Sequence, residues 1–246
     1  MRYELMLAHQ VRTAIDENWP VALPLGVMEY HGEHMALGMD TLAVTKVLER
    51  FEWERDIVIL PSLTYGAGTY AVAPPERSGA LQVNPEDFAP MATGLFRSLL
   101  RVGFRNIHFV IHHQSENFAA GMPTDLAFKF AARQAIFAFL VGTRGEGWWG
   151  DEAMRDYYAA HKEGIDPFNW IKGHPLMDAS TIERYTFDHA GIGETSLMLA
   201  LCPEAVDWNR LGDNTTWFTG TAPHATAEYG EQGVAMILDH LRRVLV

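Results

Sequence analysis

The sequence has one cysteine, no long apolar run and few basic residues. Cys202 stands alone among 246 residues, so the chain forms no intramolecular disulfide, which fits a reducing compartment. No apolar stretch reaches the roughly 20 residues that a membrane span needs. The N-terminus also lacks a basic segment followed by an apolar run, so we expect no secretion signal. These absences predict a cytoplasmic protein without a membrane partner.

The shortage of basic residues leaves the chain acidic. Lysine and arginine number 19 against 31 aspartates and glutamates, which gives a formal net charge of -12. A nucleic-acid backbone would be repelled on average, so nucleic acid is not an expected partner. Carboxylates that bind a metal would account for part of this charge, because a cation would neutralise them.

Short apolar runs alternate with amphipathic stretches along the chain. With 48% hydrophobic residues, this pattern suits one α/β domain spanning residues 1–246. Alternating strands and helices favour parallel pairing with helices on both faces, so we predict a three-layer α/β/α sandwich with a mostly parallel central sheet. The predicted helices span 4–18, 41–52, 85–102, 117–133 and 225–244, and the predicted strands span Val21–Leu25, Ile57–Leu60, Asn106–Ile111 and Ile136–Val141.

Residues 143–187 lack this periodicity. They contain Trp148 and Trp149 with many turn residues, and we interpret them as a lid-like insertion with a short helix near 151–161. In open α/β sheets the ligand binds beyond the carboxyl ends of the strands. The loops after Leu25, Leu60, Ile111 and Val141 are therefore the places to seek a site.

The first chemical motif follows the first predicted strand. Glu29-Tyr30-His31-Gly32-Glu33-His34 is followed closely by Asp40. Carboxylate and imidazole side chains together suit zinc or manganese. The alternative is a polar loop whose histidines cap neighbouring helices. Four acidic or imidazole groups within six residues favour a metal site, because such a cluster needs a compensating cation.

The second motif, His112-His113-Gln114-Ser115-Glu116-Asn117, ends the third predicted strand. Adjacent residues on a strand point to opposite faces, so we expect only one of the two histidines to be a ligand. Glu116 would begin the next helix, where a carboxylate also interacts well with the helix dipole. This motif alone does not separate a metal ligand from a first-turn acid.

The third motif, Asp188-His189 with Glu194 and Thr195 shortly after, leads into an apolar helix. A histidine beside an aspartate can act as a proton donor whose tautomer is fixed by its neighbour. The alternative treats Glu194 and Thr195 simply as helix-start residues. The two interpretations are compatible.

These three motifs, in this order, resemble the creatininase (creatinine amidohydrolase) family. Its first signature, Glu-Gln-His-Gly-x-His followed by Leu-Gly-Thr-Asp-Thr, is matched by 29–34 and 37–41. Its His-Ala-Gly signature, followed two residues later by Glu-Thr-Ser-Leu-Met-Leu, is matched by 189–199. The tail at 225–230 is similar to the family's last helix.

The resemblance implies a creatininase-like fold and a binuclear centre with two divalent metal ions, zinc or manganese. It implies that Glu29, Asp40 and a second-motif histidine hold one ion, and that His31, Asp40 and Glu116 hold the other. A water or hydroxide between the ions would be the nucleophile. His189 would give a proton to the leaving group, oriented by Asp188 or Glu194. It also implies a homo-oligomer, a hexamer as in relatives.

The sequence departs from the family pattern at two places, one in the second motif and one after Tyr65. Gln114 stands where the pattern has a histidine, so we favour His113 as the ligand, with His112 as its rival. The segment after Tyr65 lacks the histidine that many relatives carry. Substrate contacts there are therefore rebuilt, and we place Tyr65, Trp148 and Trp149 at the substrate.

The leading hypothesis is a metal-dependent hydrolase that attacks the carbonyl of a small cyclic substrate, with cyclic-amide hydrolysis first. The runner-up is hydrolytic ring opening of a cyclic diketone derived from inositol, with cleavage of a carbon–carbon bond. A different class, a non-catalytic metal or small-ligand binding protein, is motivated by Gln114. A scaffold acting through oligomer contacts would not need Glu29 or Asp40.

Overall fold

The computed structural model describes residues 1–246 and has a four-stranded parallel sheet at its centre, in the order β2-β1-β3-β4. The long pairings join β1 to β3, with Leu23 opposite Phe109, and β3 to β4, with Phe109 opposite Gly173. The strands are β1 (Val21–Leu25), β2 (Val58–Ile59), β3 (Ile107–Ile111) and β4 (Ile171–Pro175).

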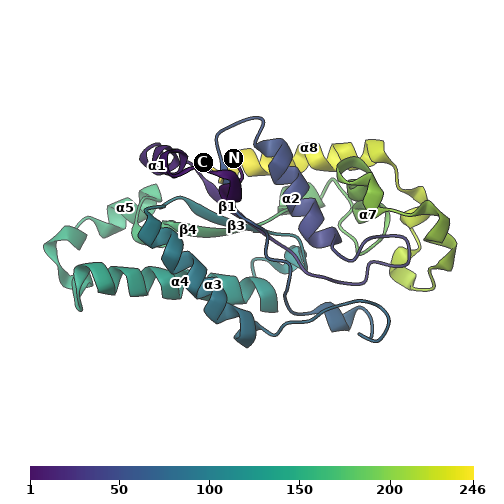
Figure 1. Cartoon of the computed structure of the whole chain (residues 1–246), viewed down its shortest axis with the longest axis horizontal. Helices are drawn as coiled ribbons and strands as arrows, with labels where there is room; N and C mark the ends of the chain where they lie inside the picture. Colours follow the sequence, from purple (N-terminus) through teal and green to yellow (C-terminus); the bar gives the residue numbers. More distant parts are fainter.

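Helices cover both faces of this sheet (Figure 1). One buried cluster joins α3 and α4 to the Leu23 and Phe109 side, and the other joins α2, α7 and α8 to the Ala22 and Val110 side. The predicted three-layer α/β/α sandwich is confirmed. The helices are α1 (Ala8–Asp16), α2 (Met39–Phe51), α3 (Pro85–Val102), α4 (Pro123–Arg144), α5 (Tyr157–Glu163), α6 (Ala179–Ile182), α7 (Ile192–Leu201) and α8 (Ala227–Val244).

One predicted strand is wrong. Residues 136–141 belong to α4, whose buried residues recur at helical spacing, as at Ala132, Ile136 and Leu140. A short apolar run cannot be assigned to strand or helix by periodicity alone. The fourth strand is instead β4, which the sequence pattern did not predict because it contains glycine and proline. A side chain at Gly173 would collide with the ring of Phe109, so the strand needs this glycine.

Residues 143–187 are consequently not an insertion throughout, because β4 supplies an edge of the central sheet. The part that precedes β4 contains α5, which begins six residues later than the predicted 151–161 helix. Figure 1 shows α5 and the end of α4 projecting at one end of the molecule.

Helix α4 also corrects the expectation about apolar length. It has 22 residues and a mean hydropathy of 1.3 over its most apolar window, which is enough to cross a membrane by length and composition alone. In this fold it packs against α3, and Phe128, Ile136 and Leu140 lie in the core. A core helix of this kind passes the same test.

The order of the strands in the sheet determines where a ligand site can lie. The chain moves outward from β1 to β2, then returns to the other side of β1 with β3. Beyond the carboxyl ends of β1 and β3 the connections diverge, and such a switch point leaves a crevice for a ligand. The first two motifs follow these two strands.

Candidate metal centre

Close packing at the end of β1 brings the first motif against Asp40. A side chain at Gly26 would lie 2.4 Å from the backbone nitrogen of Thr41, so only glycine lets the start of α2 approach this strand end. Asp40, in the first turn of α2, thereby faces the loop that holds Glu29 and His31. Two elements that follow one another in the chain thus build half of the site.

Three carboxylates are buried together at this position. Glu29, Asp40 and Glu194 are 3%, 1% and 4% exposed, and none forms a salt bridge with a lysine or an arginine. Their only ionic contacts are with histidines. Buried negative charge without a compensating cation is strongly unfavourable, so the arrangement calls for positive charge between the side chains.

Three histidines face these carboxylates in the same way. Each is bonded to a backbone carbonyl through one ring nitrogen: His31 Nδ1 to Glu29 O at 3.0 Å, His113 Nε2 to Ala67 O at 2.9 Å, and His189 Nε2 to Tyr30 O at 2.9 Å. A carbonyl only accepts, so these nitrogens carry the proton. The other nitrogen of each ring has no backbone partner and faces carboxylate oxygen, and metal-binding histidines are held in this manner.

The side chains form three groups of possible ligands, and the two that share Asp40 are called the clusters; the third group, Glu29 with His31 and His189, overlaps both. His113 Nδ1 lies 3.5 Å from both Glu29 Oε2 and Asp40 Oδ2. His31 Nε2 lies 3.6 Å from Asp40 Oδ1 and 3.5 Å from Glu194 Oε2. Ligands about 2.1 Å from a tetrahedral ion are separated by about 3.4 Å. Both clusters therefore have the dimensions of a metal site, with Asp40 placed to bridge.

The electrostatics of the site agree with a cation site. Burial disfavours charge on His31, but the carboxylates of Glu194 and Asp40 outweigh it and raise the pKa of His31 to about 9. Burial likewise opposes the charge of Asp40, yet the facing histidines hold the pKa of this carboxyl well below its usual range. The carboxylates thus create a negative potential that attracts either protons or metal ions.

Unsatisfied atoms give a direct test of whether a metal fits. His31 Nε2 and Asp40 Oδ2 are fully buried and have no hydrogen-bond partner. Buried polar atoms are normally paired, so such exceptions mark an absent ion or a functional group. Both atoms point into the clusters described above. The residues present therefore fit divalent metal ions.

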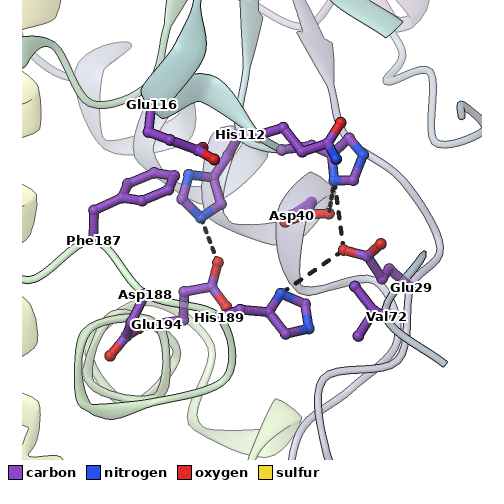
Figure 2. Close-up of a pocket in the computed structure, with 11 residues that line it drawn as sticks. Glu29, Asp40, Val72, His112, Glu116, Phe187, Asp188, His189 and Glu194 are labelled. Atoms are coloured by element: carbon purple, nitrogen blue, oxygen red, sulfur yellow. Dashed lines mark hydrogen bonds and ion pairs between the residues drawn. The ribbon is translucent and has the colours of Figure 1, made fainter. Parts of the chain in front are cut away.

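Both histidines of the second motif line the cavity, and Figure 2 shows His112 beside Glu194. Strand β3 ends at Ile111, so the alternation of strand side chains no longer applies at the next two positions. His113 faces Glu29 and Asp40, which supports the preference for it over His112. His112 Nε2 instead donates to Glu194 Oε1 at 3.0 Å. Gln114 also lines the cavity.

His189 is present in the site, but its predicted orienting partners are wrong. Its Nε2 is held by the carbonyl of Tyr30, and its Nδ1 lies 3.8 Å from Glu29 Oε2. The ring also stacks on His31, with centroids 4.3 Å apart. Asp188 accepts hydrogen bonds from the backbone N–H groups of Gly193 and Glu194 instead. Asp188 therefore caps α7, while the bare Nδ1 of His189 points toward the clusters.

The other predicted site residues lie outside the two clusters. Glu116 lines the cavity but is exposed, and its hydrogen bond is with its neighbour Asn117. Trp148 and Trp149 pack with Phe168 in an aromatic group on the α4–α5 side, away from the cavity lining. Tyr65 is 53% exposed and faces a different hollow. The structure thus corrects the placement of these three aromatic side chains at the substrate.

The cavity itself has a volume of about 400 Å³. Its apolar walls are Val72 and Phe187, which the sequence analysis did not identify. Neither residue belongs to a motif, so only the fold reveals them. The remaining wall consists of acidic, imidazole and amide side chains.

Comparisons with known proteins identify a family for this chain. The family model described as Creatininase: creatinine amidohydrolase matches residues 4–245. The creatinine amidohydrolase of Pseudomonas putida is 25% identical over 197 residues, covering 78% of this chain and 68% of the relative. The 3-dehydro-scyllo-inosose hydrolase of Thermotoga maritima is 22% identical, covering 99% of this chain and 82% of the relative.

Solved structures share the fold. A manganese form of creatininase superposes with a TM-score of 0.69 at 19% identity, covering 99% of this chain and 98% of that one. A variant creatininase described as a Zn-Zn type gives a TM-score of 0.70 at 19% identity, with the same coverage. At this level of identity, the superpositions show the architecture alone.

Proposed function

Because the chain belongs to the creatininase family of metal-dependent hydrolases, we propose that it hydrolyses a small cyclic substrate at a carbonyl with two divalent cations. One observation carries the proposal. Three imidazoles, each fixed by a backbone carbonyl, present their other ring nitrogen to three buried carboxylates that have no lysine or arginine partner. An unprotonated ring nitrogen and a carboxylate oxygen repel one another, unless a proton or a metal ion lies between them.

The assignment of ligands follows the two clusters. Glu29, Asp40 and His113 would hold one ion, and His31 with Asp40 would hold the second together with a further carboxylate. When bound, such ions lower the pKa of a water molecule and polarise a substrate carbonyl. Manganese and zinc are the expected metals, since both suit mixed carboxylate and imidazole ligands and relatives are described in manganese and Zn-Zn forms.

His189 is placed to move a proton. Its Nε2–H is held by the carbonyl of Tyr30, which leaves Nδ1 as the atom that can exchange a proton at the cavity. The ring edge meets Phe218, with centroids 4.9 Å apart, and this contact limits its rotation. Nδ1 would therefore first accept a proton from the attacking water and then pass it to a leaving group bound beside Glu29.

The cavity favours a small polar ring. Its volume of about 400 Å³ lies at the lower end of ligand pockets. Asp188, Glu116 and Gln114 supply polar groups around the clusters, and Val72 and Phe187 supply the apolar surface. We place hydrolysis of a ring amide first, as in the creatinine-hydrolysing relative. A cyclic diketone derived from inositol is the second candidate, because the inosose hydrolase aligns with 99% of this chain and a cyclitol suits polar walls.

The test uses the full chain reconstituted with manganese or zinc. Creatinine and 3-dehydro-scyllo-inosose would be incubated separately, and each ring-opened product would be detected by the mass of one added water. We expect metal-dependent turnover of one substrate that stops on chelation. Hydrolysis that continues after complete removal of metal would contradict the proposal.

The binding-protein alternative predicts at most one tightly held ion and no turnover, so the same samples test it. A homo-oligomer, hexameric by family resemblance, and a cytoplasmic location stay predictions. Light scattering of the purified chain checks the first, and fractionation of cells that express it checks the second.

A further inference from the structure

We infer that Glu194, not Glu116, is the third protein ligand of the ion that His31 and Asp40 would hold. This inference rests on the proposed two-ion function. It differs from what the family resemblance implies, which places the carboxylate of the second motif at this ion. The difference matters because it decides which acidic side chain stays free to meet the substrate.

The geometry separates the two carboxylates. Glu194 Oε2 lies 3.5 Å from the unpartnered Nε2 of His31, and Glu194, His31 and Asp40 all present ligand atoms within 4.8 Å of one another. The 3.5 Å distance between Glu194 Oε2 and His31 Nε2 matches the ~3.4 Å expected between ligands of a tetrahedral ion. Glu116 belongs to no such group, and it is exposed where the other three residues are buried.

Glu194 is also held in place through both oxygens. Its Oε2 accepts a hydrogen bond of 2.7 Å from the backbone N–H of Ala190, and its Oε1 accepts one of 3.0 Å from His112 Nε2. Each carboxylate oxygen has a second lone pair that can bind a metal. The His112 contact is the kind of outer interaction that orients ligating carboxylates.

The backbone before Glu194 also helps to hold its carboxylate in place. Ala190 is buried and has a φ of +52°, a left-handed conformation that is unfavourable for alanine and persists only where the surroundings impose it. This turn aims the N–H of Ala190 at the Glu194 carboxylate. Asp188 then caps the following helix at Gly193 and Glu194, which fixes the first turn of α7.

Glu116 lacks comparable support. It lies in a single 3-10 turn, Ser115–Asn117, that follows Gln114 with a φ of +52°. Its carboxylate accepts one hydrogen bond, from Asn117 Nδ2 at 3.3 Å. An exposed carboxylate of this kind lines the cavity without belonging to a cluster. It is thus available to hydroxyl or cationic groups of a substrate.

Diffraction from the manganese-loaded full chain tests the inference without any substitution. Anomalous maps would locate each ion. We expect two peaks that share Asp40, the second within about 2.2 Å of a Glu194 oxygen. A second ion bonded to Glu116 instead would overturn the inference and leave the proposed function standing. A single ion would overturn both.

Two matched variants give a measurement in solution. Glu194→Gln should lower the manganese content of gel-filtered protein from about two ions per chain to about one, while Glu116→Gln should keep both ions. The opposite pattern would overturn the inference. Because Glu194 is buried, circular dichroism would first show that the variant is folded.

A third variant covers the case in which Glu194→Gln does not fold. His112→Asn removes the partner of the Glu194 carboxylate and leaves the carboxylate itself. Manganese titration should then show about 10- to 100-fold weaker binding of the second ion with the first unchanged. Equal affinities for the second ion in His112→Asn and in the unchanged chain would contradict the inference.

Discussion

Two groups of histidines lie near the central sheet and differ in what surrounds them. His31 and His113 meet carboxylates beyond the carboxyl ends of β1 and β3. His108 on β3 and His174 on β4 meet one another instead, with His108 Nδ1 and His174 Nε2 2.9 Å apart. His240 of α8 continues this second group, with its ring 6.5 Å from that of His174.

The second group is satisfied by the protein alone. His108 Nε2 donates to Asn106 Oδ1, so its Nδ1 accepts from His174 Nε2, and the tautomers follow from the partners. Burial lowers the pKa of His108 well below its ordinary value. In the first group the carboxylates raise the pKa of His31, and buried atoms stay unpaired. Paired neutral histidines indicate structure, whereas unpaired histidines among carboxylates indicate a cation site.

The largest expected effect is at the shared ligand of the first group. Asp40→Asn should lower kcat/KM by more than about 100-fold, because loss of an outer-shell partner alone costs 10- to 100-fold and Asp40 faces both clusters. Steady-state kinetics and metal analysis of the same samples would measure this. His174→Gln is the control in the second group and should keep its activity at neutral pH. Full metal content and activity in Asp40→Asn would contradict the conclusion that the first group of histidines forms a cation site.

The second group should make the fold acid-sensitive. Burial, with His240 and Lys172 nearby, lowers the pKa of His174 to about 4, against about 6.5 in an unfolded chain. Below about pH 6.5 the unfolded state binds a proton that the folded state does not. This contribution to stability is therefore complete above that pH and is lost as the pH falls toward 4, by up to about 3 kcal/mol.

Denaturant unfolding of the metal-free chain across this pH range would measure the loss. His174→Gln should flatten the dependence, since glutamine can still donate to His108 but does not titrate. Parallel curves for the two proteins would show that His174 does not contribute.

A smaller effect should follow from removing the proposed proton donor. His189→Gln should lower kcat by about 100-fold, the lower range for general acid–base catalysis, while the chain keeps its metal ions. Its Nδ1 faces the cavity, but the side chain is partly exposed and lies at the edge of the clusters. Kinetics paired with metal analysis distinguish the roles. Loss of an ion in this variant would make His189 a ligand.

The smallest effect should be at Asp188, which caps α7 and does not touch His189. Asp188→Asn replaces one of the two carboxylate oxygens that accept from backbone N–H groups and should lower the free energy of unfolding by about 1 kcal/mol. Its kcat should fall less than about tenfold. A loss as large as that of His189→Gln would restore the orienting role that the sequence suggested.

The sequence was informative where a local pattern decides the structure. The strand Val21–Leu25 and the helix over 85–102 agree with the fold, because a buried run and a proline-started amphipathic stretch are determined locally. Residues 136–141 were misassigned, since only the packing of α4 separates a helix from a short strand there. Strand β4 depends on the fit of Gly173 against Phe109, a contact between distant residues.

The site likewise contains residues that local motifs predicted and contacts that only the folded chain reveals. Glu29, His31, Asp40 and His113 meet as the motifs predicted, because each follows a strand end or begins a helix at the switch point. The orientation of Glu194 and the bond between His189 and Tyr30 involve segments about 160 residues apart in the chain, and no spacing rule encodes them. The two tryptophans were predicted to lie at the substrate because they are aromatic residues in an irregular segment. In the structure they pack against Phe168 instead, away from the cavity.

The most direct test of the account is elemental analysis of the full chain after reconstitution with manganese or zinc and removal of loosely held metal. We predict about two ions per chain, since two clusters share Asp40. A chain that binds no ion, while circular dichroism shows it to be folded, would contradict the claim that these buried carboxylates and imidazoles form a metal centre.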